Sequence, residues 1–221
     1  MNARPPIAAV LWDLDGTLTD SVHFVVDTVN EVLVAHGRPP LDFAVVGGMT
    51  GQPLDVVFRH AVPELTDEEV ADWRTAYRAI YDDRAIPATR LYRGARAAVR
   101  AFRTAGLRQA TVTGKRAADC QRILTGLGLG KDIDVFLGGD SVAHPKPAPD
   151  LALRAAADLG VAPERTVVIG DTTTDMTMGR DAGARTIQVL WGYERRRLPY
   201  VDAAVRTWPE LRRTVLALAA G

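Results

Sequence analysis

The stretch LWDLDGTLTDS, residues 11–21, places Asp13 and Asp15 two positions apart, directly after an apolar run and directly before a glycine. Like charges this close repel each other, and each carboxylate resists burial unless something compensates its charge. The pair therefore needs a partner of opposite charge. The rest of the sequence has to supply the surroundings in which that partner binds.

The composition is that of an ordinary globular protein. The chain has 221 residues, of which 47% are hydrophobic and 24% charged, and 27 acidic residues balance 27 basic ones. This length is enough for one large domain, or for one domain with a small insert. Because the chain has no net charge, it offers no global attraction to nucleic acid or to an anionic membrane, and neither partner is expected.

The sequence favours a cytoplasmic protein. No apolar stretch approaches the roughly 20 residues of a membrane span, and the start MNARPP, residues 1–6, lacks the apolar core of a signal peptide. Cys120 is the only cysteine, which excludes an internal disulfide and a thiolate metal cluster. We expect it to be a buried, inert thiol.

Short apolar runs alternate with helical patterns along most of the chain. The runs predict strands that are covered on both faces of a parallel sheet. They lie at residues 7–12, 108–112, 133–138, 165–170 and 185–191. Helices are predicted over 94–106 and 149–160, where apolar residues share one face and a glycine stops the pattern. This alternation predicts an α/β fold with a doubly wound, Rossmann-like parallel sheet.

One interval breaks the alternation. From about residue 19 to residue 90 only helical signals occur, including a valine stripe within residues 22–29 and a capping box formed by Thr66 and Glu69. We therefore predict a small helical cap domain over residues 19–90, inserted into an α/β core domain. The predicted core domain comprises residues 1–18 and 91–221. Since the insert begins just after the aspartate pair, it is expected to act as a lid over the site.

Polar residues follow the predicted strands at their carboxyl ends, where open α/β sheets gather ligands. Asp13 follows the first strand, Thr113 the second and Asp171 the fourth, and Lys146 stands in the loop after the third. Carboxylates that lie close together bind Mg²⁺ through their oxygens, while a lysine, a hydroxyl and loop amides neutralise a phosphate. This set of residues predicts phosphoryl transfer with a bound divalent cation.

In that chemistry the two aspartates of the opening stretch take different roles. Asp13, kept ionised by the metal, is the predicted nucleophile and forms an aspartyl-phosphate. Asp15, held protonated, donates to the leaving oxygen and later activates water. Gly16 lets the backbone turn tightly, so that the amides after it can meet phosphate oxygens.

Four motifs, in this order, resemble those of phosphatases of the haloacid dehalogenase superfamily. They are DLDGT at 13–17, TG at 113–114, KPAP at 146–149 and GDTTTD at 170–175. With LYRG at 91–94 and DAGA at 181–184, the resemblance covers nearly the whole chain. Four motifs at successive strand ends are far more specific than the first one alone.

The resemblance implies a role for each matching residue. The implied catalytic residues are Asp13, Asp15 and Lys146. The implied phosphate-binding residues are Gly16, Thr113, Gly114 and Lys146. The implied ligands of Mg²⁺ are Asp13, Asp15 through its backbone carbonyl, Asp171, and Asp175 as a supporting carboxylate that binds directly or through water.

The second motif departs from the pattern of many relatives. They follow its threonine with asparagine, where this chain has Gly114. A side-chain amide is lost and a backbone N–H remains, so the orientation of the substrate is affected rather than catalysis. The sequence TGK also does not fit a nucleotide-binding loop, because Gln109 stands in place of its first glycine and Arg116 in place of its Ser or Thr.

Within the superfamily the sequence favours a phosphatase. Dehalogenases and phosphonatases replace the second aspartate of the first motif, whereas Asp15 is present here, and no lysine precedes Lys115 to act as the lid lysine of a phosphonatase. A mutase usually has a lid arginine after a GxS turn, where this chain offers Thr50 or Gly51. A non-catalytic binding protein on the same fold is disfavoured because Asp13 is present.

The overall likeness is to phosphoglycolate phosphatase-like hydrolases with a helical cap. It implies Mg²⁺-dependent hydrolysis of a small phosphorylated metabolite by a monomer or homodimer. A sugar phosphomutase similar to β-phosphoglucomutase remains an alternative. So does a phosphatase of a secondary-metabolite pathway, such as those of aminohydroxybenzoate antibiotics.

Overall fold

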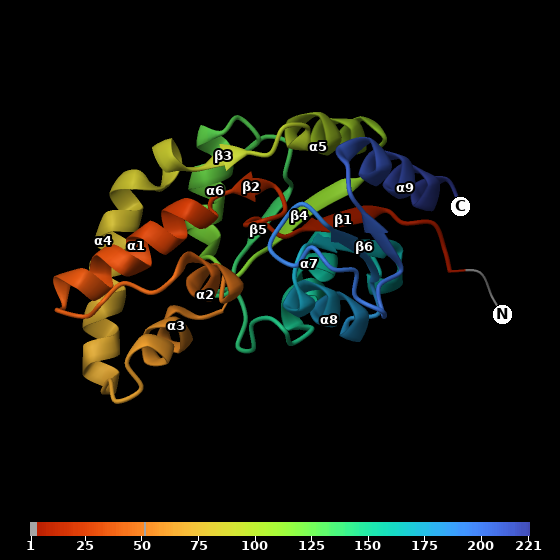
Figure 1. Ribbon diagram of the computed structural model, residues 1–221. Coiled ribbons are helices and arrows are strands. Elements are labelled where there is room, and N and C mark those ends of the chain that lie inside the picture. The colour runs from red at the N-terminus through yellow and green to blue at the C-terminus, as the bar shows by residue number, and fades with distance from the viewer. Residues whose placement is uncertain (1–3, 51) are drawn as a thin grey trace. The chain divides into compact units, whose positions relative to one another are not determined.

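The computed structural model of the chain describes residues 4–50 and 52–221 (Figure 1). Gly51, which the mutase comparison invokes, and the first three residues of the MNARPP start lie outside the described residues. The chain divides into two compact units. The core unit comprises Met1–Asp20 and Leu91–Gly221, and the helical unit comprises Ser21–Arg90.

The core unit contains a six-stranded parallel sheet with the strand order β5-β4-β1-β6-β7-β8. The strands are β1 (Ala9–Trp12), β4 (Arg108–Val112), β5 (Val135–Leu137), β6 (Thr166–Gly170), β7 (Arg185–Val189) and β8 (Ala203–Val205). The predicted doubly wound α/β fold is confirmed, and the five predicted strands are β1 and β4–β7. The sequence does not predict β8, because an apolar run of three residues is too short to be distinguished from a loop.

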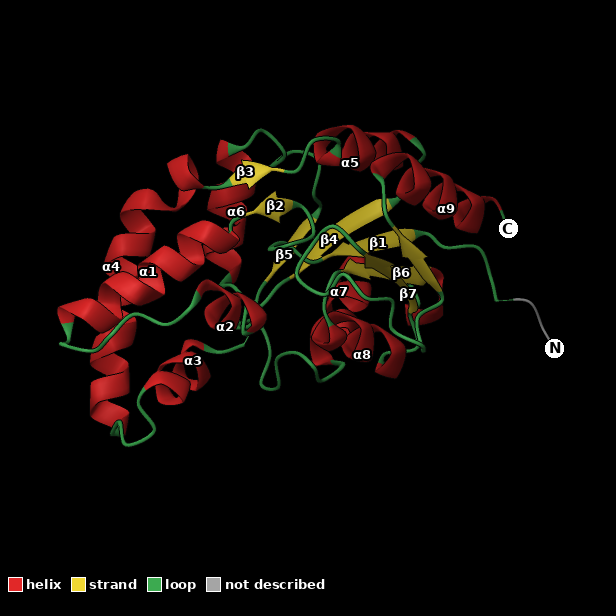
Figure 2. Ribbon diagram, viewed as in Figure 1, coloured by secondary structure: helices red, strands yellow, loops and turns green. Residues whose placement is uncertain are grey.

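Strand β1 lies in the middle of the sheet and all four of its residues are buried. It is flanked by β4 and β6, so that Trp12 lies beside Thr111 on one side and Ile169 on the other. Figure 2 shows helices on both faces of this sheet. A strand made only of apolar residues is stable at this position because helices cover both faces of the sheet.

Two hydrophobic clusters, one on each face, attach the helices of the core unit to the sheet. These helices are α5 (Ala95–Thr104), α6 (Ala117–Gly126), α7 (Asp150–Leu159), α8 (Thr173–Asp181) and α9 (Trp208–Ala220). A short 3₁₀ helix, η1 (Pro163–Arg165), has no buried residue. Residues of α5, α6 and α9 belong to one cluster and residues of α7 and α8 to the other. Helix packing on both faces holds the carboxyl ends of the strands in fixed positions.

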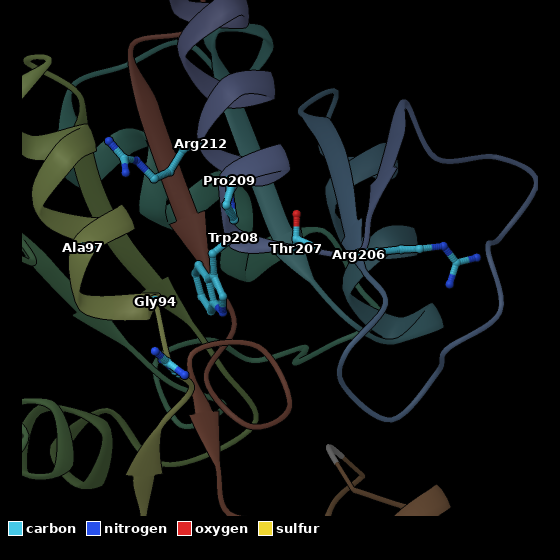
Figure 3. Close-up of a pocket in the computed structure, with 8 residues that line it drawn as sticks. Gly94, Ala97, Arg206, Thr207, Trp208, Pro209 and Arg212 are labelled. Atoms are coloured by element: carbon cyan, nitrogen blue, oxygen red, sulfur yellow. The ribbon is translucent and has the colours of Figure 1, made fainter.

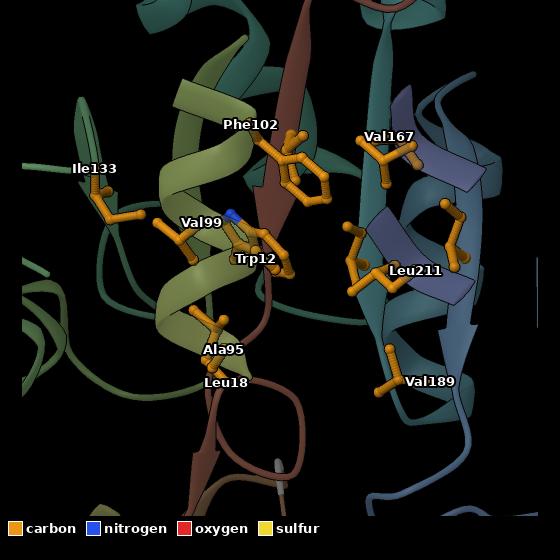
Figure 4. Packing of buried hydrophobic residues seen from close by; sticks show 14 of the residues in the cluster. Trp12, Leu18, Ala95, Val99, Phe102, Ile133, Val167, Val189 and Leu211 are labelled. Atoms are coloured by element: carbon orange, nitrogen blue, oxygen red, sulfur yellow. The ribbon is translucent and has the colours of Figure 1, made fainter. Parts of the chain in front are cut away.

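Trp12 belongs to the core. Its ring stacks on Phe102 of α5 with ring centroids 5.8 Å apart (Figure 4), and its Nε1–H donates to Gln109 Oε1 at 2.9 Å. Cys120 is also buried, as predicted, and burial raises the pKa of its thiol to about 12. Both side chains belong to the buried cluster on one face of the sheet.

In the described residues of the helical unit, four helices pack around a small core of their own. They are α1 (Val22–Ala35), α2 (Phe43–Gly48), α3 (Leu54–Ala61) and α4 (Asp67–Ala88). Thr66 and Glu69 form the predicted capping box at the start of α4. In the valine stripe of α1, Val26 and Val29 are buried while Val22 and Val25 are only half-buried. Two short strands, β2 (Thr19–Asp20) and β3 (Arg90–Leu91), pair with each other in a separate sheet.

A membrane-spanning helix is absent from the described residues. None of their helices combines the length and the apolar character that crossing a bilayer requires.

Candidate active site

Neighbouring strand ends bring the predicted residues together in the core unit. Asp13 follows β1, Thr113 follows β4 and Asp171 follows β6, and these three strands are adjacent in the order β4-β1-β6. The backbone N–H of Asp13 continues the ladder by donating to the Ile169 carbonyl at 2.9 Å. The register of a parallel sheet therefore fixes where Asp13 and Asp171 stand relative to each other.

Three carboxylates form one buried group, which we call the acidic group: Asp13, Asp171 and Asp175. Each offers an oxygen that lies within 4.8 Å of an oxygen of the other two. Their exposed fractions are 6%, 0% and 1%. Burial, followed by the charge of Asp175, raises the pKa of Asp13 to about 7, and burial with the charges of the other two raises the pKa of Asp171. The acidic group therefore carries more negative charge than the protein around it compensates.

Lys146 supplies one positive charge to the acidic group. Its Nζ lies 2.7 Å from Asp13 Oδ1 and also donates to Asp175 Oδ1, and its side chain is 4% exposed. Burial alone would lower the pKa of this ammonium, but the charges of Asp13 and Asp175 raise it above its usual range. One ammonium faces three carboxylates, so the group retains a net attraction for a cation.

Asp171 is held by two donors. Thr17 Oγ1 donates to Oδ1 at 3.1 Å and the Tyr193 backbone N–H donates to Oδ2 at 2.6 Å. Gly16 and Gly192 both border this carboxylate so closely that a Cβ atom on either would overlap with it. Both positions therefore need glycine, because a larger side chain there would overlap with the Asp171 carboxylate.

Asp175 uses both of its oxygens within the protein. Oδ2 accepts from the Thr172 N–H at 3.0 Å and the Thr172 hydroxyl at 2.7 Å, which is a capping box at the start of α8, while Oδ1 accepts from Lys146. These contacts tie the start of α8 to Lys146 and thereby help to orient the ammonium beside Asp13.

The Asp15 side chain is held apart from the acidic group. Its Oδ2 forms an ion pair with Lys115 Nζ at 2.8 Å, and its Oδ1 lies 3.5 Å from Thr19 Oγ1. Both partners of the ion pair are largely buried, with side-chain exposures of 12% and 11%. Two aspartates two positions apart thus have different surroundings, which is the condition for giving them different roles.

The residues predicted to bind phosphate lie at the same strand ends. Thr113 is buried, and its Oγ1 accepts from the Lys115 backbone N–H at 3.3 Å. Gly114 is exposed. Gly16 adopts a φ of +81°, a conformation that glycine takes without the strain other residues incur. The roles of these residues remain predictions, since the geometry shows their placement alone.

Sequence reasoning missed three residues that the structure places at the site. Thr17 belongs to the DLDGT motif but has no predicted role. Lys115 is noted from the sequence only within TGK and as the first lysine of the chain. Tyr193 follows β7, and no periodicity or motif pointed to it. Each becomes visible only when the contacts to Asp15 and Asp171 are known.

A separate surface pocket of about 510 Å³ lies in the core unit (Figure 3). It is lined by Arg93, Gly94, Ala97, Arg206, Thr207, Trp208, Pro209 and Arg212. None of the predicted site residues is among them. Its arginines are exposed, and the side chains of Arg206 and Arg212 point in different directions, so they do not converge on one anion. The predicted site residues therefore lie at and around the acidic group and not in this pocket.

Comparison with protein families matches residues 10–189 to the family described as Haloacid dehalogenase-like hydrolase. The chain belongs to this family. A phosphoglycolate phosphatase of Xanthomonas campestris is 34% identical, over 84% of this chain and 84% of that protein. The N-acetylmuramic acid 6-phosphate phosphatase of Pseudomonas aeruginosa is 32% identical, over 86% of this chain and 84% of that protein.

Solved structures of this family share the fold. The crystal structure of a predicted phosphoglycolate phosphatase from Haemophilus somnus superposes with a TM-score of 0.87 and covers 94% of this chain and 97% of that chain. Its sequence is 24% identical, so this likeness shows the fold alone. The family match and the phosphatase relatives confirm the resemblance to haloacid dehalogenase phosphatases that the four motifs carry.

Proposed function

We propose that the protein hydrolyses a small phosphate monoester with Mg²⁺ as cofactor, through an aspartyl-phosphate on Asp13. The observation that carries this proposal is the acidic group itself. Three buried carboxylates lie with oxygens within 4.8 Å of one another, and Lys146 is bound to two of them. An arrangement with this much uncompensated charge is suited to a divalent cation and to a phosphate that the cation brings in.

The residues present fit a hard divalent cation. The group offers only oxygen donors, as Mg²⁺ prefers, and two of its carboxylates have raised pKa values that a cation would lower. We assign Asp13, Asp171 and the Asp15 backbone carbonyl as ligands, with Asp175 in support. Bound Mg²⁺ would neutralise part of the charge that develops on the transferring phosphoryl group.

Asp13 and Asp15 divide the reaction between them. An oxygen of Asp13 attacks phosphorus and the ester P–O bond breaks, while Asp15 gives a proton to the departing alcohol oxygen. For this step Asp15 has to carry a proton in place of its ion pair with Lys115. Asp15, now ionised, takes a proton from a water molecule whose oxygen attacks phosphorus. The P–O bond to Asp13 then breaks and inorganic phosphate forms, which restores both carboxyl groups.

The remaining residues hold the phosphate. Lys146 lies against Asp13 and would balance the charge of the phosphoryl oxygens during transfer. The Thr113 hydroxyl and the amides at Gly16 and Gly114 are assigned as hydrogen-bond donors to those oxygens. We further propose that the helical unit acts as a lid that admits small esters and excludes larger ones.

The two relatives named above support a small phosphorylated metabolite as substrate, and 2-phosphoglycolate is the first to try. A cytoplasmic location and a monomeric or homodimeric state stay predictions. The same is true of the alternatives, a sugar phosphomutase or a phosphatase of a secondary-metabolite pathway.

Phosphate release from a panel of esters tests the proposal. The panel comprises 2-phosphoglycolate, N-acetylmuramic acid 6-phosphate, hexose phosphates, nucleotides and an aryl phosphate, each with Mg²⁺ and with a chelator. Metal-dependent release concentrated on one small ester supports the proposal. Interconversion of hexose phosphate isomers without release would replace hydrolysis by mutase chemistry. Release that is unaffected by the chelator would remove the metal from the proposal.

A further inference from the structure

The surface pocket between the first turns of α5 and α9 has no part in the proposed function. Its volume is about 510 Å³. Six of its eight lining residues are exposed, and the other two, Gly94 and Trp208, are half-buried. The pocket is therefore shallow. Because a small-molecule site usually encloses most of its ligand, a shallow pocket is better suited to one side chain of a larger partner.

The floor of the pocket is apolar and fixed in place. The Trp208 ring packs against Trp191 with ring centroids 4.6 Å apart. A Cβ atom on Gly94 would come within 2.6 Å of Trp208 Cγ, so the backbone at Gly94 lies directly against the indole. Ala97 and Pro209 complete the apolar part of the lining. A surface that is rigid before binding loses little conformational entropy when a partner docks on it.

Three exposed arginines surround this floor, and each lacks a counter-charge. They are Arg93, Arg206 and Arg212, and none of them forms an ion pair with a residue that the structure describes. Further along α5 the situation differs, because Arg100 pairs with Asp132 and Arg103 with Asp134. Positive charge is therefore compensated beside the pocket and left uncompensated around it.

The acidic residue at the start of α9 is occupied by the backbone. A carboxylate oxygen of Glu210 accepts from the Arg206 N–H at 2.7 Å and from the Thr207 N–H at 3.2 Å, as part of the capping box of this helix. No residue that lines the pocket is acidic. The pocket thus combines an apolar floor with a positively charged rim, and a partner has to supply the negative charge.

The arginines point away from one another. In Figure 3 the side chains of Arg206 and Arg212 extend in different directions on the two sides of Trp208. A compact anion such as phosphate cannot reach both, whereas an extended chain with several carboxylates can. The hollow between them accommodates an inserted side chain, which the flat surface of a membrane does not provide.

We propose that this pocket docks an acidic segment of a partner protein. An apolar side chain of the segment packs on Trp208, and Asp or Glu residues on either side of it pair with the arginines of the rim. Tryptophan and arginine are the residue types that most often dominate the binding energy of protein interfaces. The inference goes beyond the proposed function, since none of the lining residues takes part in the reaction.

Fluorescence anisotropy of dye-labelled peptides tests the proposal. The probe is a seven-residue peptide of glutamates with one central leucine. Saturable binding to the wild type with a Kd below about 1 mM is expected, and it should weaken as salt is added. A peptide with glycine in place of the leucine should bind at least about tenfold more weakly, because the apolar contact is lost. A peptide with lysines in place of the glutamates should not bind.

Variants of the rim and of the floor locate the binding site. Arg212→Glu should weaken binding of the glutamate peptide at least about tenfold, because an attraction is replaced by a repulsion. Arg213→Glu is the matched control, since Arg213 is an exposed arginine of the same helix that does not line the pocket. It should weaken binding less than about threefold. Ala97→Glu places a carboxylate of the chain itself on the floor and should abolish binding.

Several outcomes would overturn the proposal, and none of them affects the proposed function. Equal weakening by Arg212→Glu and Arg213→Glu would show an unspecific charge effect. Tighter binding to anionic vesicles or to single-stranded DNA than to the peptide would assign the arginines to a different kind of partner. Oligomers of the wild type that Arg212→Glu dissociates, without peptide binding, would assign the pocket to a second copy of the chain. Absence of binding to the glutamate peptide would leave the pocket without this role.

Discussion

Replacing Asp13 with asparagine should stabilise the metal-free protein, and the gain should increase with pH. Burial, with the charge of Asp175, raises the pKa of Asp13 from 3.8 to about 7. In the unfolded chain this carboxyl loses its proton near pH 4, whereas the folded protein keeps it until about pH 7. The folded state therefore binds the extra proton, and the free energy of unfolding decreases as pH rises between these values.

The size of this effect follows from the two pKa values of Asp13. Each unit of difference corresponds to about 1.4 kcal/mol, so an ionised Asp13 destabilises the metal-free fold by roughly 4 kcal/mol above pH 7. From pH 5 to pH 8 the wild type should lose roughly 2 to 3 kcal/mol more than Asp13→Asn. Asp13 also raises the pKa of Asp171, so Asp13→Asn relieves that repulsion as well, which changes the pH dependence in the same direction.

Urea denaturation in the presence of a chelator, at intervals from pH 5 to pH 8, measures this difference. Asp181→Asn is the control, because Asp181 is an exposed carboxylate of the same unit, paired with Arg180. Adding Mg²⁺ to the wild type at pH 8 should restore about 2.7 kcal/mol at a concentration of 100 Kd, and less to Asp13→Asn. Parallel pH profiles of the wild type and Asp13→Asn would refute the electrostatic account of the acidic group.

Three further predictions concern the same site. Asp15→Asn should slow esters with poor leaving groups at least about tenfold more than an activated aryl phosphate, because only the former need a proton; equal losses in kcat would contradict the acid role. Lys146→Met leaves buried carboxylates without their ion-pair partner and should lower the free energy of unfolding of the metal-free protein by about 3–5 kcal/mol in urea denaturation. Lys131→Met, at an exposed lysine, is the control. Gly16→Ala should lower the free energy of unfolding by about 1–3 kcal/mol more than Gly183→Ala, because Gly183 has a similar φ of +79° but open space around it. Equal shifts in Tm for the two variants would mean that the contact with Asp171 is unimportant.

Much of the core unit can be predicted from the sequence because its strands are short apolar runs buried on both faces. The five runs, the helices over 94–106 and 149–160 and the Thr66 capping box depend on local patterns, and the structure confirms them. Strand β8 was missed because three small apolar residues carry no periodicity, and its place is decided by pairing with β7.

The candidate site was predictable for a different reason. Parallel strands end at one edge of a sheet, so residues that follow adjacent strands must meet there, whatever their separation in sequence. This placed Asp13, Thr113 and Asp171 together. It could not indicate that Lys146 would lie between Asp13 and Asp175, or that Lys115 would pair with Asp15, because side-chain contacts across loops have no sequence period.

Tyr193 shows the limit of sequence reasoning most clearly. A tyrosine after a strand is compatible with a loop, a core or a binding role, and nothing in WGYE distinguishes them. Its relevance follows from a backbone donor to Asp171 and from a buried hydroxyl without a partner in the residues that the structure describes.

In the proposed reaction, Asp13 carries the phosphoryl group during turnover. Borohydride added while the enzyme hydrolyses its best substrate with Mg²⁺ would reduce an acyl phosphate to an alcohol, and peptide mass spectrometry would locate the reduced residue. Homoserine is expected at position 13, with the other carboxyl groups of the acidic group unreduced. Sustained phosphate release with Asp13 unreduced, or with the reduced residue elsewhere, would contradict it.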